Sequence, residues 1–292
     1  MKRILNLHEE ATHLRLREAC EANDAHVFAK VRVADVLPIE NSGIDDMLYR
    51  FALQSHFDFV IADRTHTPLF AVEFDGPSHQ ESAQRERDER KDFLCERFSF
   101  PLLRVNSRYL SRKYRDMDLL TWFVDVWFCQ KWFEEAQASG QVPRDEPFMP
   151  QSFVTLPGHK HRFPLWLSAA VRGRIQKLFF DGKVLDLVPS QIIAVDTRGN
   201  YHALSFLRID TERGVMAQTG MRSQNFPVSE CDALDEIVTN ELFANVQEAL
   251  AEPEKAVPAS EIRTRIALFS VSYKFRRLFH SGGSYEIPTS NL

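Results

Sequence analysis

The sequence is poor in glycine and rich in phenylalanine, with 11 glycines and 23 phenylalanines among 292 residues. Glycine supplies the backbone freedom that flexible tracts need, so its scarcity excludes long flexible stretches and favours dense aromatic cores. Hydrophobic residues make up 44% of the chain and charged residues 26%, and no internal repeat is visible. This composition predicts a globular protein with one large domain or two ordinary ones.

Cysteine is also scarce, and long hydrophobic runs are missing. The four cysteines (Cys20, Cys95, Cys129 and Cys231) include no pair at C-x-x-C spacing, so the sequence signals no zinc site. They are typical of buried thiols in a reducing compartment. No run reaches the roughly 18 apolar residues that a membrane-spanning helix needs. The charged N-terminal stretch does not resemble a signal peptide. We therefore expect a cytoplasmic protein with no membrane partner.

Positive charge is not in excess over the whole chain, whose net charge is −5. This excludes a uniformly basic nucleic-acid coat protein. Residues 104–115, however, contain five basic side chains and no acidic one. Such a cluster either attracts phosphates or forms a solvated surface segment.

Hydrophobic patterning predicts an α/β domain over residues 1–137. Its elements follow the order α-β-β-β-α-β-α, which favours a mixed sheet flanked by helices. Asn6 and Glu9 are placed to form a capping box at the start of the first helix. The second and third strands read as a hairpin. The predicted helices are 6–22, 80–98 and 116–137, and the predicted strands are 26–37, 56–63, 69–76 and 101–107.

The second half of the chain has a different character. Prolines and a glycine in residues 138–151 predict a linker. Residues 152–292 then predict a smaller α+β domain, with an antiparallel meander at 190–220 and a helix at 229–251. The basic, aromatic segment 261–279 fits either base stacking or a core with outward-facing cations. A partner protein, a second copy of the chain and nucleic acid are the candidate ligands of this domain.

Three carboxylates gather in the predicted hairpin. Glu73 and Asp75 lie one residue apart in an apolar strand, so alternation places them on one face, and strand pairing brings Asp58 of the preceding strand to Glu73. Converging carboxylates repel one another, which a divalent cation offsets. Mg²⁺ prefers such oxygen ligands and activates water for phosphodiester hydrolysis. The alternative for each acid taken singly is a solvent-facing or salt-bridged residue.

The stretch “FDFVIAD…FAVEFDGPSHQ…RERDERKDFLCERFSFPLLRVNS” resembles the PD-(D/E)XK, or restriction-endonuclease-like, nuclease superfamily. Within it, the resemblance is to the branch of very-short-patch-repair-like endonucleases and related uncharacterised bacterial domains. It covers about residues 6–115 and implies a restriction-endonuclease-like mixed sheet. It also implies a Mg²⁺- or Mn²⁺-dependent endonuclease that acts on DNA, in phage defence or DNA repair.

The same resemblance implies a set of metal ligands. By position, Asp58 and Glu73 match the two metal-binding acids, and the backbone carbonyl of Phe74 matches a further ligand. Glu10 (or Glu9) on the first helix is placed like an accessory acid of the metal site.

One position departs from the pattern of these nucleases. Asp75 stands where many of them have a catalytic lysine, so it either holds a second metal ion or leaves the lysine's role to Lys30 or Lys91. His79 is a candidate base for the attacking water, or a candidate phosphate ligand. The departure also motivates an alternative function, a nuclease fold that binds nucleic acid or a partner without cutting.

Basic residues after the hairpin are the expected phosphate contacts. Arg85, Arg90 and Lys91 lie on the predicted helix 80–98, and Arg104 lies on the last strand. The alternative is ordinary helical pairing between residues four apart, such as Glu86 with Arg90.

Overall fold

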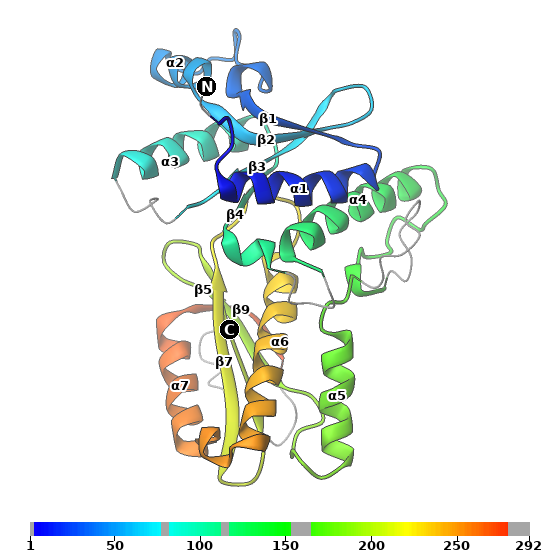
Figure 1. Ribbon diagram of the computed structural model, residues 1–292, viewed down its shortest axis with the longest axis vertical. Coiled ribbons are helices and arrows are strands. Elements are labelled where there is room, and N and C mark those ends of the chain that lie inside the picture. The colour runs from blue at the N-terminus through cyan, green and yellow to red at the C-terminus, as the bar shows by residue number, and fades with distance from the viewer. Residues whose placement is uncertain (1–2, 77–81, 112–116, 153–164, 280–292) are drawn as a thin grey trace. The chain divides into compact units, whose positions relative to one another are not determined.

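The computed structural model describes residues 3–76, 82–111, 117–152 and 165–279. The chain divides into two compact units (Figure 1). The first comprises Met1–Leu165 with Gln224–Val228, and the second comprises Trp166–Ser223 with Ser229–Leu292. Residues 138–151, the predicted linker, fall within the first unit, where the side-chain amide of Gln137 donates to the carbonyls of Pro143 (2.8 Å) and Glu146 (3.0 Å).

The first unit contains a four-stranded mixed sheet in the order β1-β2-β3-β4. The first three strands pair antiparallel, as the predicted hairpin requires, and β4 pairs parallel to β3. The predicted mixed sheet is thus confirmed. The strands are β1 (His26–Arg32), β2 (His56–Ala62), β3 (Pro68–Phe74) and β4 (Leu102–Val105).

Helices of the first unit begin and end close to the predicted limits, with one addition. The helices are α1 (Leu7–Glu21), α2 (Asp46–Gln54), α3 (Ser82–Arg97) and α4 (Leu119–Ala138), with 3-10 turns η1 (Val33–Asp35), η2 (Ser107–Leu110) and η3 (Pro150–Ser152). The sequence reading missed α2, a short helix capped by Asp45, whose side chain accepts from the Leu48 amide at 2.8 Å. The strand predicted over 26–37 stops at Arg32, because the chain turns into η1 and buries Val33.

Aromatic side chains form the core between the sheet and α4. Phe70 of β3 packs against Trp127 of α4, with ring centroids 4.8 Å apart, and against Phe226 at 5.3 Å. Trp122 and Phe123 of α4 are almost fully buried. Several of the phenylalanines thus form the dense core that the composition predicts.

A distant segment covers the outer edge of β4. Asn225 accepts from the Leu102 amide at 2.6 Å, and the Gln224 side chain accepts from the Arg104 amide at 2.8 Å and donates to the Arg104 carbonyl at 3.2 Å. These bonds satisfy backbone groups that an edge strand otherwise leaves open. Residues Gln224–Val228 therefore complete the first unit although they lie far along the chain.

The second unit contains a five-stranded antiparallel sheet in the order β8-β7-β6-β5-β9. Its strands are β5 (Ser190–Val195), β6 (Tyr201–Arg208), β7 (Arg213–Met221), β8 (Val257–Pro258) and β9 (Lys274–Phe279). Its helices are α5 (Ala169–Phe180), α6 (Glu230–Ala251) and α7 (Ala259–Ser272), with the 3-10 turn η4 (Pro253–Lys255). The predicted meander and the helix at 229–251 are both present, whereas α5, α7, β8 and β9 were not predicted.

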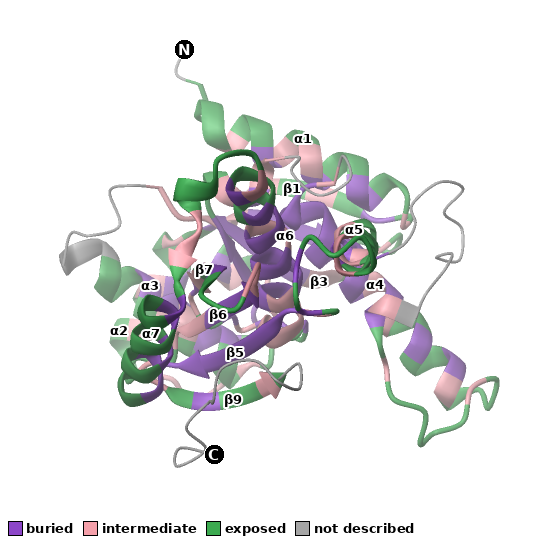
Figure 2. Ribbon diagram, turned by 90° about the horizontal axis from the view of Figure 1, so that it is seen from below, coloured by how far each residue is buried: buried purple, intermediate pink, exposed green. Residues whose placement is uncertain are grey.

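The basic, aromatic segment 261–279 places two of its aromatic residues in the core of this unit, while most of its other residues are exposed. Phe269 of α7 and Phe275 of β9 are buried in one cluster with Ile192 of β5. Figure 2 shows β5 buried along its length while much of α7 is exposed. For these two aromatic residues, burial in the core is therefore the correct one of the two expected roles. No helix among the described residues is long and apolar enough to cross a membrane.

Candidate functional site

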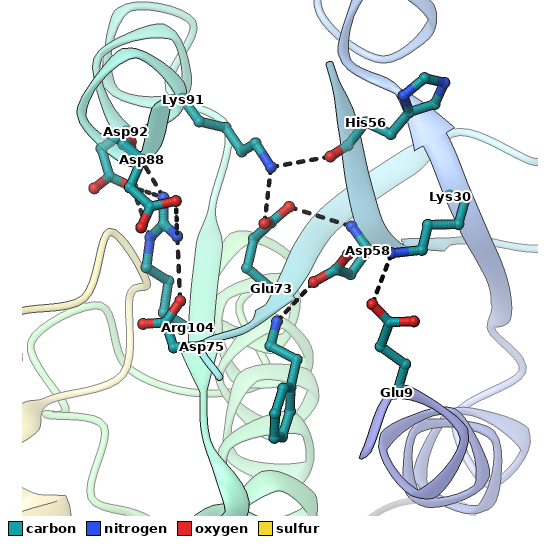
Figure 3. Close-up of polar contacts among 11 residues, drawn as sticks. Glu9, Lys30, His56, Asp58, Glu73, Asp75, Asp88, Lys91, Asp92 and Arg104 are labelled. Atoms are coloured by element: carbon teal, nitrogen blue, oxygen red, sulfur yellow. Dashed lines mark hydrogen bonds and ion pairs between the residues drawn. The ribbon is translucent and has the colours of Figure 1, made fainter. Parts of the chain in front are cut away.

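Asp58 and Glu73 meet where the pairing of β2 with β3 ends. The last paired residues are Phe59 and Val72, so Asp58 and Glu73 are the next opposed pair. Beyond this point each carboxylate replaces a backbone partner: Glu73 Oε1 accepts from the Asp58 amide at 3.2 Å, and Asp58 Oδ2 accepts from the Phe74 amide at 2.9 Å (Figure 3). The two acids therefore lie opposite each other, as the strand pattern predicts.

Glu73 is held in a nearly dry setting by Lys91 of α3. The residue is 7% exposed, and the Lys91 ammonium lies 2.8 Å from Glu73 Oε2 while donating to the His56 carbonyl at 2.9 Å. Burial raises the pKa of Glu73, the Lys91 charge opposes that shift, and the neighbouring Asp58 charge adds to it. Lys91 is itself buried, so it acts as an internal counter-ion and not as the expected surface phosphate contact.

Lys30 reaches the same place from β1 through an unusual backbone conformation. Its φ is +56°, a left-handed value that costs a non-glycine residue about 1–3 kcal/mol. Its ammonium lies 2.6 Å from Asp58 Oδ1 and 2.8 Å from Glu9 Oε1 (Figure 3). Burial works to lower the pKa of Lys30, but the hydrogen bonds from Asp58 and Glu9 outweigh it and raise the pKa. Lys30 is thus a charged lysine beside Asp58.

From the first turn of α1, Glu9 and not Glu10 reaches the Lys30 ammonium. Glu9 uses Oε2 to accept from the Asn6 amide at 2.9 Å, which completes the predicted capping box, and Oε1 to hold Lys30. Glu10 points elsewhere and pairs with Arg3 at 2.8 Å on the exposed side. Of the two expected acids, Glu9 is therefore the one that faces β1, because the capping box turns its side chain toward that strand.

Asp75 does not join Asp58 and Glu73, contrary to the expected convergence of three acids. It lies 3.4 Å from the guanidinium of Arg104, which also contacts Asp88 at 3.3 Å and Asp92 at 2.7 Å. Arg104 is 3% exposed. Burial works to lower its pKa, but the surrounding carboxylates, Asp92 first, raise it. Arg104 is therefore an internal counter-ion for this second cluster and not a surface phosphate contact.

The remaining candidates lie in different surroundings. Arg85 is exposed on α3. Arg90 pairs with Glu86 one turn away, as the helical alternative proposed. His79 lies outside the described residues.

Sequence reasoning missed three side chains of this region. Asp88 and Asp92 lie four residues apart on α3, so their common helical face was the available signal. His8, in the first turn of α1, stacks on Phe74 with ring centroids 5.3 Å apart.

The donor set suits a hard divalent cation in type. Two carboxylates with water commonly suffice for Mg²⁺, and Asp58 and Glu73 supply them. Within the described ranges, no group of three His, Cys, Asp or Glu side chains is arranged to hold a metal ion. The region drawn in Figure 3 brings six carboxylates and three basic side chains together. The acids are Glu9, Asp58, Glu73, Asp75, Asp88 and Asp92, and the bases are Lys30, Lys91 and Arg104.

A family model described as a protein of unknown function (DUF2726) matches residues 1–118. The match spans β1 to β4 and every residue labelled in Figure 3. No curated protein and no solved structure matches the chain.

Proposed function

We propose that the first unit is a divalent-metal-dependent nuclease that hydrolyses phosphodiester bonds of DNA. The observation that carries this proposal is the opposition of Asp58 and Glu73 at the end of a strand pair, beside two lysines. The order of helices and strands, with α3 linking β3 to the parallel β4, supports a restriction-endonuclease-like fold. A role in phage defence or DNA repair, in the cytoplasm, belongs to the same proposal.

Each residue of the site has a distinct role in this reaction. Asp58, Glu73 and the Phe74 carbonyl would hold Mg²⁺ or Mn²⁺, which supplies an activated water and stabilises charge on the phosphoryl oxygens. Lys91 orients the Glu73 carboxylate from behind through its 2.8 Å contact. Asp75 is held by Arg104 and takes no part.

In this proposal Lys30 serves as the catalytic lysine, because Asp75 occupies the sequence position where many of these nucleases have one. Its ammonium is charged and lies beside Asp58, and its side chain is 33% exposed. It neutralises Asp58 in the ground state and would turn to the non-bridging oxygen of the phosphate as negative charge grows there. The strained backbone at Lys30 is consistent with a residue placed for function.

A specific observation favours a second function, nucleic-acid binding without cleavage. Asp58, Glu73 and Asp75 each already have a basic partner within 3.4 Å. Such ion pairs hold a site together without metal, and a metal ion must displace Lys30 or Lys91 to bind there.

Cleavage of plasmid and single-stranded DNA by the full chain separates these functions. We compare Mg²⁺, Mn²⁺ and EDTA, and the variants Asp58→Asn and Glu73→Gln with the control Glu10→Gln, whose acid is exposed and lies outside the site. The nuclease proposal expects metal-dependent cleavage that both site variants abolish and the control retains. Equal cleavage by all four proteins refutes the site. Binding without cleavage under every metal supports the second function.

A further inference from the structure

A cleft of about 890 Å³ lies between α2 and α3 in the first unit. One face of each helix lines it, because the lining residues recur at helical spacing. From α2 these are Arg50, Phe51 and Gln54, and from α3 they are Arg87, Arg90 and Lys91. The cleft thus has two facing walls that each carry arginine.

The cleft has an excess of positive charge that the fold leaves available. Its lining includes four basic side chains, of which Arg90 pairs with Glu86 and Lys91 with Glu73. It also includes two acids, one of which, Asp88, faces the buried Arg104. Arg50 and Arg87 are exposed, and among the described residues neither has an acidic side chain within ion-pair distance. This differs from the region of Figure 3, where each basic side chain is paired.

Lys91 connects the cleft to the candidate site. Its side chain lines the cleft, while its ammonium contacts Glu73 and the carbonyl of His56, another lining residue. A molecule in the cleft therefore lies beside the backbone that leads from His56 to Asp58. The wall also presents Phe51, with the Arg90 guanidinium 5.8 Å above its ring.

We propose that this cleft binds the sugar–phosphate backbone of a nucleic-acid strand, with Arg50 and Arg87 contacting separate phosphates on either side of the strand. The inference rests on the proposed nuclease function and names where its substrate lies. Guanidinium groups match phosphate oxygens in two-pronged geometry. A polymer fits better than a small phosphate compound, because the two arginines stand on different walls and Lys91, which also lines the cleft, contacts Glu73.

The test is fluorescence anisotropy with short labelled single- and double-stranded oligonucleotides, in EDTA so that cleavage does not interfere. The wild type is compared with Arg50→Ala/Arg87→Ala and with the control Arg17→Ala/Arg64→Ala, which removes two exposed arginines outside the cleft. Each phosphate contact steepens the slope of log K against log salt concentration by about 0.7–0.9. At about 0.1 M salt, this corresponds to about five- to eightfold in affinity for each contact. The cleft variant should therefore bind about 25- to 60-fold more weakly, with a slope smaller by about 1.5.

Further variants and outcomes keep the inference separate from the nuclease proposal. Arg50→Lys/Arg87→Lys retains the charges, so it should keep the wild-type salt slope but recover only part of the affinity, because lysine lacks the two-pronged geometry. Unchanged affinity in the alanine variant, or no binding by the wild type, overturns the inference even where cleavage is seen. Binding that depends on the two arginines, without cleavage under any metal, upholds the cleft and refutes the nuclease.

Discussion

Replacement of Lys91 by methionine tests whether Glu73 is a buried, compensated carboxylate. The side chains of the pair are 10% and 9% exposed, and their 2.8 Å contact provides a positive charge close to Glu73. Methionine fills a similar volume but leaves the carboxylate and the His56 carbonyl without this donor. Removing one partner of a buried pair destabilises a protein by about 3–5 kcal/mol. With a urea slope of about 2 kcal/mol/M, the midpoint should fall by about 2 M.

The effect should depend on pH in a defined direction. Burial already raises the pKa of Glu73 above its ordinary value, and loss of Lys91 removes a charge that holds it down. A folded-state pKa above the unfolded one means that stability is greatest at low pH and is lost as the pH rises through the folded pKa. Lys91→Met should therefore lose more stability relative to the wild type at about pH 7.5 than at about pH 5.

Urea unfolding followed by tryptophan fluorescence is a suitable assay, because three of the four tryptophans (Trp122, Trp127 and Trp132) lie in α4 of the first unit. Arg17→Met is the control, since it removes an exposed pair with Glu21 and should change stability by less than about 1 kcal/mol. Adding Glu73→Gln to Lys91→Met should restore part of the loss, because no uncompensated charge then stays buried. A loss equal at both pH values, or no recovery in the double variant, refutes the reasoning.

The remaining predictions concern the core and the site. Phe226→Ala should destabilise the first unit by about 3–5 kcal/mol and speed hydrogen exchange at the β4 amides, because the ring is only 6% exposed and packs against Phe70. As a control, Phe180→Ala, at a 78% exposed position, should change stability to urea by less than about 0.5 kcal/mol. Lys30→Met should reduce metal-dependent cleavage by about 100-fold or more in kcat while KM changes little, since its charge acts on the transition state. Glu9→Gln should impair cleavage in the same assay because Glu9 contacts Lys30, whereas a matched loss in Glu10→Gln contradicts this assignment.

Local features of the fold were predictable from sequence. The capping box of α1 and the hairpin of β2 with β3 depend on residues a few positions apart, so their spacing determines them. The opposition of Asp58 and Glu73 follows from the period of two along paired strands. The helix α2 was equally predictable but was missed, although the Asp45 cap and a clear amphipathic pattern over its nine residues mark it.

The composition of the sequence also determined the character of the core, and its alternation determined the face on which Glu73 lies. Only the tertiary structure decided which cation each acid meets. Asp75 pairs with Arg104 because β4 lies parallel beside β3, and Lys30 reaches Asp58 through a left-handed backbone conformation. The edge of β4 is closed by Gln224–Val228, whose contact with Arg104 spans 120 positions. Strand pairing across such separations leaves no local pattern, because its geometry is set by packing and not by neighbouring residues.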